Sequence, residues 1–183
     1  MITSTLPSLY ADSGLSSYLN QIKLFPVLTL DQEFMLAERY SKYNDKEAAH
    51  ELVTSHLRLV AKIALRYRGY GLPVSDLISE GNIGLMKAVK KFQPELGFRL
   101  STYAMWWIKA SVTEYVLKSW SMVKMGTMAA QKKLFFSLRK AKEKLNLINS
   151  NDIDFESAKV LSEQFNLSEQ DIVNMNSRMT IRD

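Results

Sequence analysis

Residues 76–89 read Asp76-Leu-Ile-Ser-Glu-Gly-Asn-Ile-Gly-Leu-Met-Lys-Ala-Val89, and this stretch decides the fold. Its apolar residues recur with helical spacing, which predicts a helix over residues 74–92. The stretch also holds Gly81 and Gly84, and each glycine costs a helix interior about 1 kcal/mol relative to alanine. We expect the close approach of another helix to compensate this cost. That helix comes either from this chain or from another protein, and composition does not choose between the two.

Helical patterns also occupy the N-terminal side of this stretch. Residues 14–24 form a short helix that stops near Pro26, and residues 29–33 have the polar start and early acids of a second helix. Pro73 can open the helix of residues 74–92. The helix before it is predicted from one apolar stripe that ends at two glycines: Leu52, His56, Leu59, Ile63 and Tyr67, then Gly69 and Gly71.

The C-terminal side is predicted to be helical too. A turn at residues 94–97 precedes a long helix, which we expect Ser101 or Thr102 to cap and which reaches about residue 120. A basic helix over residues 127–147 follows.

The last part of the chain is predicted to hold two short helices, residues 155–165 and 168–179, which resemble a helix-turn-helix. Strand-like alternation is nowhere sustained, so we predict an all-α fold. We expect a larger helical domain over residues 1–120 and a small domain with the basic helix and the helix-turn-helix-like pair over residues 121–183.

Composition excludes several classes of protein. The chain has no cysteine, which excludes a disulfide framework, a cysteine zinc site and a thiol nucleophile. The two histidines, His50 and His56, are a poor basis for a metal site, so we expect them on helix surfaces and expect no metal or other cofactor. We find no signal peptide and no run of roughly 20 apolar residues, and we therefore expect a cytoplasmic protein without a membrane span.

Positive charge is concentrated in one segment. The net charge of the chain is +5, but residues 118–144 alone carry eight Lys/Arg and one Glu, a net charge of +7. Residues 1–117 have a net charge of +2 and residues 145–183 one of −4. Such a block is typical of a surface that binds polyanions, although a solvated helix face has the same composition.

Aromatic residues are grouped in Phe98-Arg-Leu-Ser-Thr-Tyr-Ala-Met-Trp-Trp-Ile-Lys109. Adjacent side chains point about 100° apart on a helix, so Trp106 and Trp107 do not fit one core stripe, and we expect at least one to be exposed. An exposed tryptophan near Tyr103 and Lys109 can stack unpaired bases and attract phosphates. The other interpretation is a core tryptophan beside one interface tryptophan.

Four stretches together resemble bacterial RNA polymerase sigma factors, in order as well as in spacing. The resemblance runs from about Ser17 to Met179, and the last stretch is similar to a box distinctive of heat-shock sigma factors. The four are His56-Leu-Arg-Leu-Val-Ala-Lys-Ile-Ala64, residues 76–89, residues 98–109 and Gln131-Lys-Lys-Leu-Phe-Phe-Ser-Leu-Arg-Lys140. The resemblance implies the sigma-factor helical bundle, and a non-enzymatic factor for promoter recognition and melting at heat-shock or other stress genes.

The resemblance also implies partners and site residues. The partners are core RNA polymerase, through the clamp of its large subunit, and promoter DNA at the minus-ten element and the non-template strand. Chaperones or proteases that control the level of the factor are further candidate partners. Residues implied in core-polymerase binding are Asp76, Glu80, Asn82, Met86, Lys132, Lys133, Arg139 and Lys140. Those implied in DNA binding are Phe98, Tyr103, Trp106, Trp107, Lys109, Thr113, Lys118 and Lys124.

Two residues and the length of the sequence depart from the family pattern. Ser121 stands where arginine is expected and Ala129 where lysine is expected, and both changes remove positive charge near the minus-ten element. The usual minus-ten preference is therefore not carried over. The sequence stops at Asp183, before the C-terminal domain that reads the minus-thirty-five element in family members, so we expect that domain to be absent.

Three other functions compete with this interpretation. The first is a truncated, promoter-inert remnant that still binds polymerase, and core-dependent binding to promoter DNA discriminates against it. The second is an enzyme acting on flipped bases, but a zinc constellation and a convincing acid–base pair are missing. The third is a repressor, which would bind duplex DNA tightly without polymerase.

Overall fold

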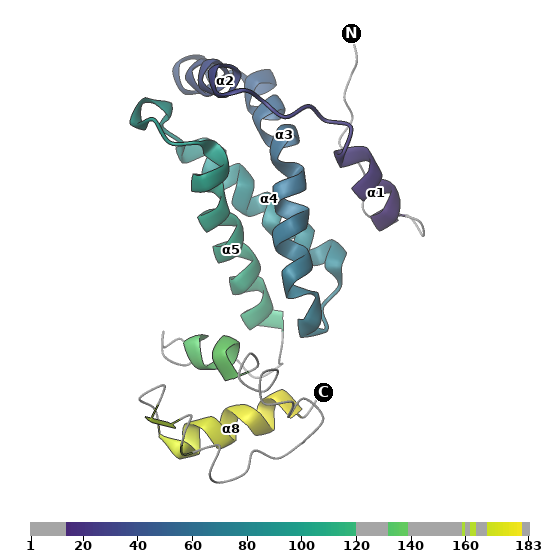
Figure 1. The fold of residues 1–183 in the computed structure, drawn as a ribbon, viewed down its shortest axis with the longest axis vertical. Coiled ribbons are helices and arrows are strands. Elements are labelled where there is room, and N and C mark those ends of the chain that lie inside the picture. The colour runs from purple at the N-terminus through teal and green to yellow at the C-terminus, as the bar shows by residue number, and fades with distance from the viewer. Residues whose placement is uncertain (1–13, 120–131, 139–158, 160–161, 164–167, 181–183) are drawn as a thin grey trace. The chain divides into compact units, whose positions relative to one another are not determined.

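The computed structural model describes residues 14–119, 132–138, 159, 162–163 and 168–180 of the 183-residue chain (Figure 1). The regular elements in these residues are helical, so the predicted all-α fold class is confirmed. In chain order they are α1 (Gly14–Ile22), α2 (Leu30–Tyr43), α3 (Lys46–Ala64), the 3₁₀ helix η1 (Leu65–Tyr70), α4 (Val74–Lys91), the 3₁₀ helix η2 (Pro94–Leu96), α5 (Leu100–Ser119) and α8 (Glu169–Thr180).

The chain divides into two compact units, Met1–Val116 and Leu117–Asp183. In the second unit, residues 132–138 are helical and bury Leu134, Phe135 and Leu138. The start of α8 is capped by Ser168, whose hydroxyl oxygen accepts a hydrogen bond from the Asp171 amide at 3.1 Å. The rest of the predicted basic helix, and most of the predicted helix over residues 155–165, lie outside the described residues. The predicted domain boundary after residue 120 stays a prediction.

Local capping explains where α2 and α3 begin. Thr29 and Gln32 form a capping box: the Thr29 hydroxyl accepts from the Gln32 amide at 3.3 Å, and the Gln32 side chain accepts from the Thr29 amide at 3.0 Å. Asn44, at φ 51°, ends α2 in the left-handed conformation that asparagine tolerates. Asp45 then caps α3, since its carboxylate accepts from the Glu47 and Ala48 amides. The helix start predicted at residues 29–33 is confirmed.

The core of the first unit lies between the long helices α3, α4 and α5, which Figure 1 shows side by side. The two glycines of α4 make this packing possible. A Cβ atom on Gly84 would lie 2.7 Å from the Trp107 carbonyl oxygen of α5, and one on Gly81 would lie 2.6 Å from a Val60 methyl group of α3. The compensating neighbours are therefore helices of this chain. The largest fully buried side chains of the three helices are Leu52, Val60, Leu77, Ile78, Leu85, Leu100 and Ile108.

The start of α5 differs from the prediction. Ser101 and Thr102 lie inside the helix rather than at its cap, because α5 begins at Leu100. The Leu100 amide instead donates to the Glu33 carboxylate at 2.6 Å, so a side chain of α2 takes the place of a local cap. Glu33 is only 3% exposed, which makes it part of the interior of this unit.

His56 also corrects the sequence analysis, which expected both histidines on helix surfaces. It is buried, and its Nδ1 lies 2.8 Å from the Leu52 carbonyl oxygen and 2.9 Å from the Ser55 hydroxyl. Its Nε2 faces the Glu33 carboxylate at 3.8 Å. The residues that the structure describes contain no group of three His, Asp or Glu side chains placed to hold a metal ion. Among their helices, none combines the length and apolar composition that a bilayer crossing requires.

Candidate nucleic-acid interface

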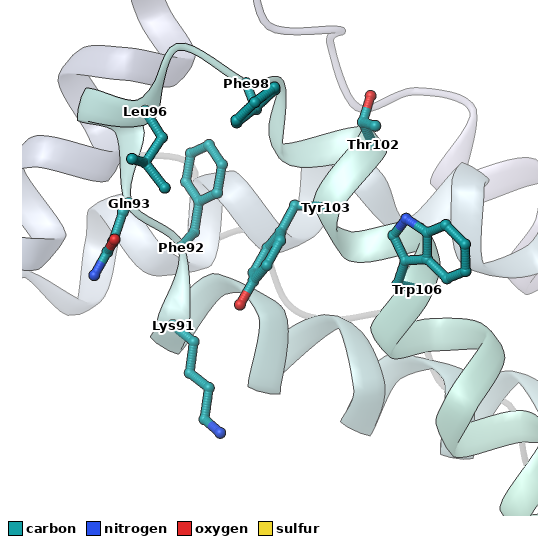
Figure 2. Close-up of a pocket in the computed structure, with 8 residues that line it drawn as sticks. All are labelled: Lys91, Phe92, Gln93, Leu96, Phe98, Thr102, Tyr103 and Trp106. Atoms are coloured by element: carbon teal, nitrogen blue, oxygen red, sulfur yellow. The ribbon is translucent and has the colours of Figure 1, made fainter.

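An open hollow of about 600 Å³ lies where the end of α4 and the start of α5 meet (Figure 2). Aromatic rings dominate its wall, and its polar side chains are neutral or positive, with no acid among them. Figure 2 shows Phe98 next to Phe92 and Leu96, while Tyr103 and Trp106 project from α5. The lining residues are Lys91, Phe92, Gln93, Leu96, Phe98, Thr102, Tyr103 and Trp106.

The two adjacent tryptophans have different environments. Trp106 is 70% exposed, which confirms the prediction that at least one of them is accessible. Trp107 is half-buried rather than fully packed, and its ring meets Tyr103 edge-on at a centroid distance of 6.2 Å. The Lys91 ammonium lies 4.7 Å from the Trp107 ring centroid, and the Lys109 ammonium 5.8 Å from that of Trp106. Both cations are within reach of a favourable interaction with the ring faces.

Phe98 and Tyr103 complete the aromatic wall of the hollow. Phe98 is 67% exposed although it is fully apolar, which is costly unless a ligand covers it. Tyr103 is half-buried, and its ring lies 5.9 Å from that of Phe92. Phe92 also lines the hollow, and its contact restricts the Tyr103 ring before any ligand arrives.

The remaining predicted DNA-binding residues lie further along α5. Thr113 is half-buried, and its hydroxyl is 3.3 Å from the Tyr67 hydroxyl of η1. Lys118 is exposed near the C-terminal end of the helix. Lys124 lies outside the described residues, as do the departures Ser121 and Ala129.

The predicted docking residues of α4 lie on its solvent side but are not equally exposed. Met86 is 52% exposed. Asp76 and Glu80 are half-buried, and the Asp76 carboxylate accepts a hydrogen bond from the Tyr115 hydroxyl at 3.1 Å. Asp76 and Glu80 are therefore less accessible to a partner than Met86 is.

Asn82 is also half-buried, and it connects α4 with α1. Its amide group donates to the Tyr18 hydroxyl at 3.4 Å. Its carbonyl oxygen is buried without a hydrogen-bond partner among the described residues. Burial raises the pKa of the Tyr18 phenol, which further favours the neutral hydroxyl that accepts this hydrogen bond. Asn82 therefore contributes to the fold of the first unit as well as to the surface of α4.

The basic segment of the second unit is described in part. Lys132 and Lys133 are exposed, next to the buried pair Leu134 and Phe135. The two lysines are therefore free to face a partner while the apolar residues pack. Arg139 and Lys140 lie outside the described residues.

The sequence analysis missed residues at both surfaces. Ile83 is 38% exposed on the solvent side of α4, between Glu80 and Met86. Its position off the buried stripe is a signal that could have revealed it. Leu96, 63% exposed in η2, and Lys91 line the hollow, but their contribution depends on a turn geometry that spacing alone does not give.

The hollow and its surroundings can accommodate planar rings attached to a negatively charged backbone. Exposed aromatic side chains offer stacking surfaces, and nearby lysines attract phosphates. Gln93 and Thr102 supply hydrogen-bonding groups at the rim. Single-stranded nucleic acid is the ligand that matches this combination.

Comparison with known proteins agrees with this chemistry. Residues 14–46 match the family Sigma-70 factor, region 1.2, and residues 52–122 match Sigma-70 region 2. The hollow and the α4 surface both lie within the region 2 match. The chain belongs to the sigma-70 family of RNA polymerase sigma factors.

The chain is also similar to individual sigma factors of several bacteria. The chain is 54% identical over 180 residues to RNA polymerase sigma factor RpoH of Caulobacter vibrioides, an alignment that covers 98% of this chain and 61% of the relative. It is 56% identical to RpoH of Zymomonas mobilis, with 98% and 60% covered. RNA polymerase sigma-C factor of Myxococcus xanthus is 44% identical over 176 residues, with 96% and 59% covered. The chain thus spans about three fifths of the length of these relatives.

Proposed function

We propose that this chain confers promoter recognition and DNA melting on core RNA polymerase, for the transcription of heat-shock genes. The observation that carries the proposal is the aromatic hollow with Trp106 and Phe98 exposed at its edge. A base displaced from the non-template strand would stack there, with its phosphates near Lys91 and Lys109. The identity to RpoH factors supports the heat-shock class of promoter.

The energetics require a partner. Separating about ten base pairs costs on the order of 14 kcal/mol, at ~1.4 kcal/mol per step. Stacking contributes ~1–3 kcal/mol per base, so three aromatic residues offset roughly 3–9 kcal/mol. The chain alone therefore does not hold a bubble open, and the polymerase has to bind the rest of the melted DNA.

The surface of α4 is the proposed contact with the polymerase. Met86 and Ile83 form an apolar centre beside the half-buried acids Asp76 and Glu80. An apolar centre with a polar rim is the usual composition of a protein interface. Lys132 and Lys133 of the basic segment are proposed as a second contact, with Arg139 and Lys140.

Several finer points belong to the same proposal. The chain acts as an initiation subunit in the cytoplasm, where core polymerase works, and has no enzymatic activity of its own. Chaperones or proteases that control its level are candidate partners. The proposed DNA-binding set includes Lys118 and Lys124 in addition to the residues around the hollow.

Reconstitution with core polymerase tests the function directly. The purified chain is added to core enzyme and to a heat-shock promoter with an extended minus-ten element, and thymines in the bubble are probed with permanganate. We expect core-dependent reactivity that Trp106→Ala strongly reduces. Binding to core without any promoter opening would instead identify the promoter-inert polymerase-binding remnant.

A further inference from the structure

Positive charge without partners is concentrated at the end of α3 and in η1, away from the aromatic hollow. Residues 52–75 contain no aspartate or glutamate and four cations. Lys62, Arg66 and Arg68 are exposed, whereas Arg58 is half-buried. None of the four forms an ion pair with a carboxylate of the described residues.

The opposite end of α3 has the usual arrangement of surface charges. Asp45, which caps that end, is paired with Arg39 of α2, and in the same helix Lys42 is paired with Glu38. Exposed cations with acids close by are neutralised within the protein. Lys62, Arg66 and Arg68 form no such pair with an acid of the described part of the chain, so their charge is available to an external anion.

A hydrogen bond fixes the position of η1. The Tyr67 hydroxyl lies 3.3 Å from the Thr113 hydroxyl of α5, and the Tyr67 and Tyr70 ring centroids are 6.0 Å apart. Gly71, at φ 76°, closes the turn in a conformation that side chains rarely adopt. Successive side chains of a 3₁₀ helix point about 120° apart. Because Tyr67 is turned toward α5, Arg66 and Arg68 project on either side of this contact.

The position of η1 relative to the hollow suggests what it binds. Thr113 follows Trp106 by seven residues, which corresponds to about 10 Å along α5. Duplex DNA advances about 3.4 Å per base pair, so η1 lies roughly three base pairs from a base stacked at Trp106. A contact at that distance reaches the adjoining double helix when the base stacked at Trp106 lies at the edge of the melted segment.

We propose that η1 binds the phosphate backbone of the duplex that borders the melted DNA, through Arg66 and Arg68. The guanidinium group matches phosphate geometry with two parallel hydrogen bonds, and arginine remains charged at every physiological pH. Lys62, one turn before Arg66, extends the positive surface. This inference rests on the proposed function, since it needs an open promoter next to the hollow.

The test compares a neutralised variant with a control that has the same net charge. The variant is Arg66→Gln with Arg68→Gln, and the control is Lys23→Gln with Lys46→Gln, two exposed cations far from η1 in sequence and without ion pairs among the described residues. Each protein is assembled with core polymerase. Binding to two DNA probes is then titrated at several salt concentrations. Both probes contain the same single-stranded non-template segment, and one of them also continues into an upstream duplex.

We expect the variant to bind the duplex-containing probe more weakly, with a slope of log affinity against log salt that is lower by about one to two, at ~0.9 per lost phosphate contact. Its binding to the single-stranded probe should equal that of the parent. The control should match the parent on both probes. Arg66→Lys with Arg68→Lys keeps the charge and should restore most of the slope, which excludes misfolding as the cause.

The outcomes separate this inference from the proposed function. If the parent holoenzyme binds neither probe, the proposed function fails and the inference fails with it. If the parent binds both probes and the variant keeps the parental slope on the duplex, only the inference is overturned. Loss of affinity for core polymerase with unchanged DNA binding would also overturn it, because η1 would then contact an acidic protein surface.

Discussion

The Arg99 guanidinium binds the Glu33 carboxylate, joining residues that lie 66 positions apart in the sequence. Arg99 Nη2 and Nε are 3.0 and 3.2 Å from Glu33 Oε2. The same carboxylate accepts the first amide of α5 from Leu100. Because Phe98 of the hollow directly precedes Arg99, α2 holds the segment that carries one wall of the candidate nucleic-acid site.

Replacing Glu33 with glutamine should destabilise the fold and weaken DNA binding together. A buried hydrogen bond to a charged group contributes about 1.5–3 kcal/mol, so we expect a loss of that size in the free energy of unfolding. Glu51→Gln, at an exposed position on α3, is the matched control and should change little. Chemical denaturation measures the first effect and titration with single-stranded DNA in the holoenzyme the second. Full stability in Glu33→Gln would show that the network contributes nothing.

Replacing each of the two tryptophans with alanine should have a different effect. Trp106→Ala should leave thermal stability nearly unchanged and cost ~1–3 kcal/mol of stacking, a 5- to 150-fold loss of open-complex stability. Trp107→Ala should lower the free energy of unfolding by about 1–3 kcal/mol, less than a fully buried tryptophan would, because Trp107 is half-buried. Permanganate reactivity and thermal denaturation provide the two measurements. If both variants open promoters as well as the parent does, the two tryptophan rings contribute only to packing and not to promoter opening.

Gly84→Ala should destabilise the first unit by about 1–3 kcal/mol despite the better helix propensity of alanine. The new methyl group would clash with the Trp107 backbone, and shortening a side chain cannot relieve a clash with backbone atoms. Gly81→Ala instead meets a Val60 methyl group, so the additional change Val60→Ala should relieve that clash. Denaturant midpoints of the single and double variants test the contrast. A Gly84→Ala protein as stable as the parent would contradict the described helix separation.

The α4 surface should tolerate substitution without unfolding while it loses affinity for polymerase. Glu80→Lys combined with Met86→Asp changes the rim and the apolar centre, so we expect weaker core binding with a thermal midpoint close to that of the parent. Glu51→Lys, at an exposed position on α3, repeats the Glu80→Lys charge change and serves as the control for that substitution. Asn82→Ala is less suitable, since its bond to Tyr18 gives it a structural role as well. Unchanged affinity for core in competition titrations would remove this surface from the interface.

The exposed lysines of the second unit provide a further test. Lys132→Gln with Lys133→Gln should weaken holoenzyme assembly and flatten its dependence on salt, because two charges no longer contact a polyanionic or acidic partner. Since both side chains are exposed, folding should be retained. Circular dichroism checks that the fold is intact, and core titrations at several salt concentrations check the slope. A salt dependence of core binding equal to that of the parent would mean that these lysines are only solvent-exposed and contact no partner.

Much of the fold follows from local sequence signals. The capping box of Thr29, the glycine and proline between α3 and α4, and the apolar spacing of α4 each depend on neighbouring residues. For that reason the helices predicted over residues 14–24 and 74–92 agree with α1 and α4 to within a few residues. The exposure of Trp106 also follows from the angle between adjacent positions on a helix.

What the sequence analysis missed depends on residues that are distant in the chain. The start of α5 is set by Glu33, and the burial of His56 comes from the packing of α2 on α3. The start of α5 leaves no signal within one turn, whereas the place of His56 in the apolar stripe after Leu52 was a local signal of its burial. The partner of Gly84 could not be predicted for the same reason, since only the assembled helices show that it is Trp107.

The contact between Gly84 and the Trp107 carbonyl has a mechanical consequence. Side chains can adjust their rotamers under load, whereas two backbones in direct contact cannot. A displacement of α4 is therefore transmitted directly to the part of α5 that carries Trp106 and Trp107. If polymerase shifts α4 when it docks, we expect the stacking surface of Trp106 to shift with it, because no side chain at position 84 separates the two helices.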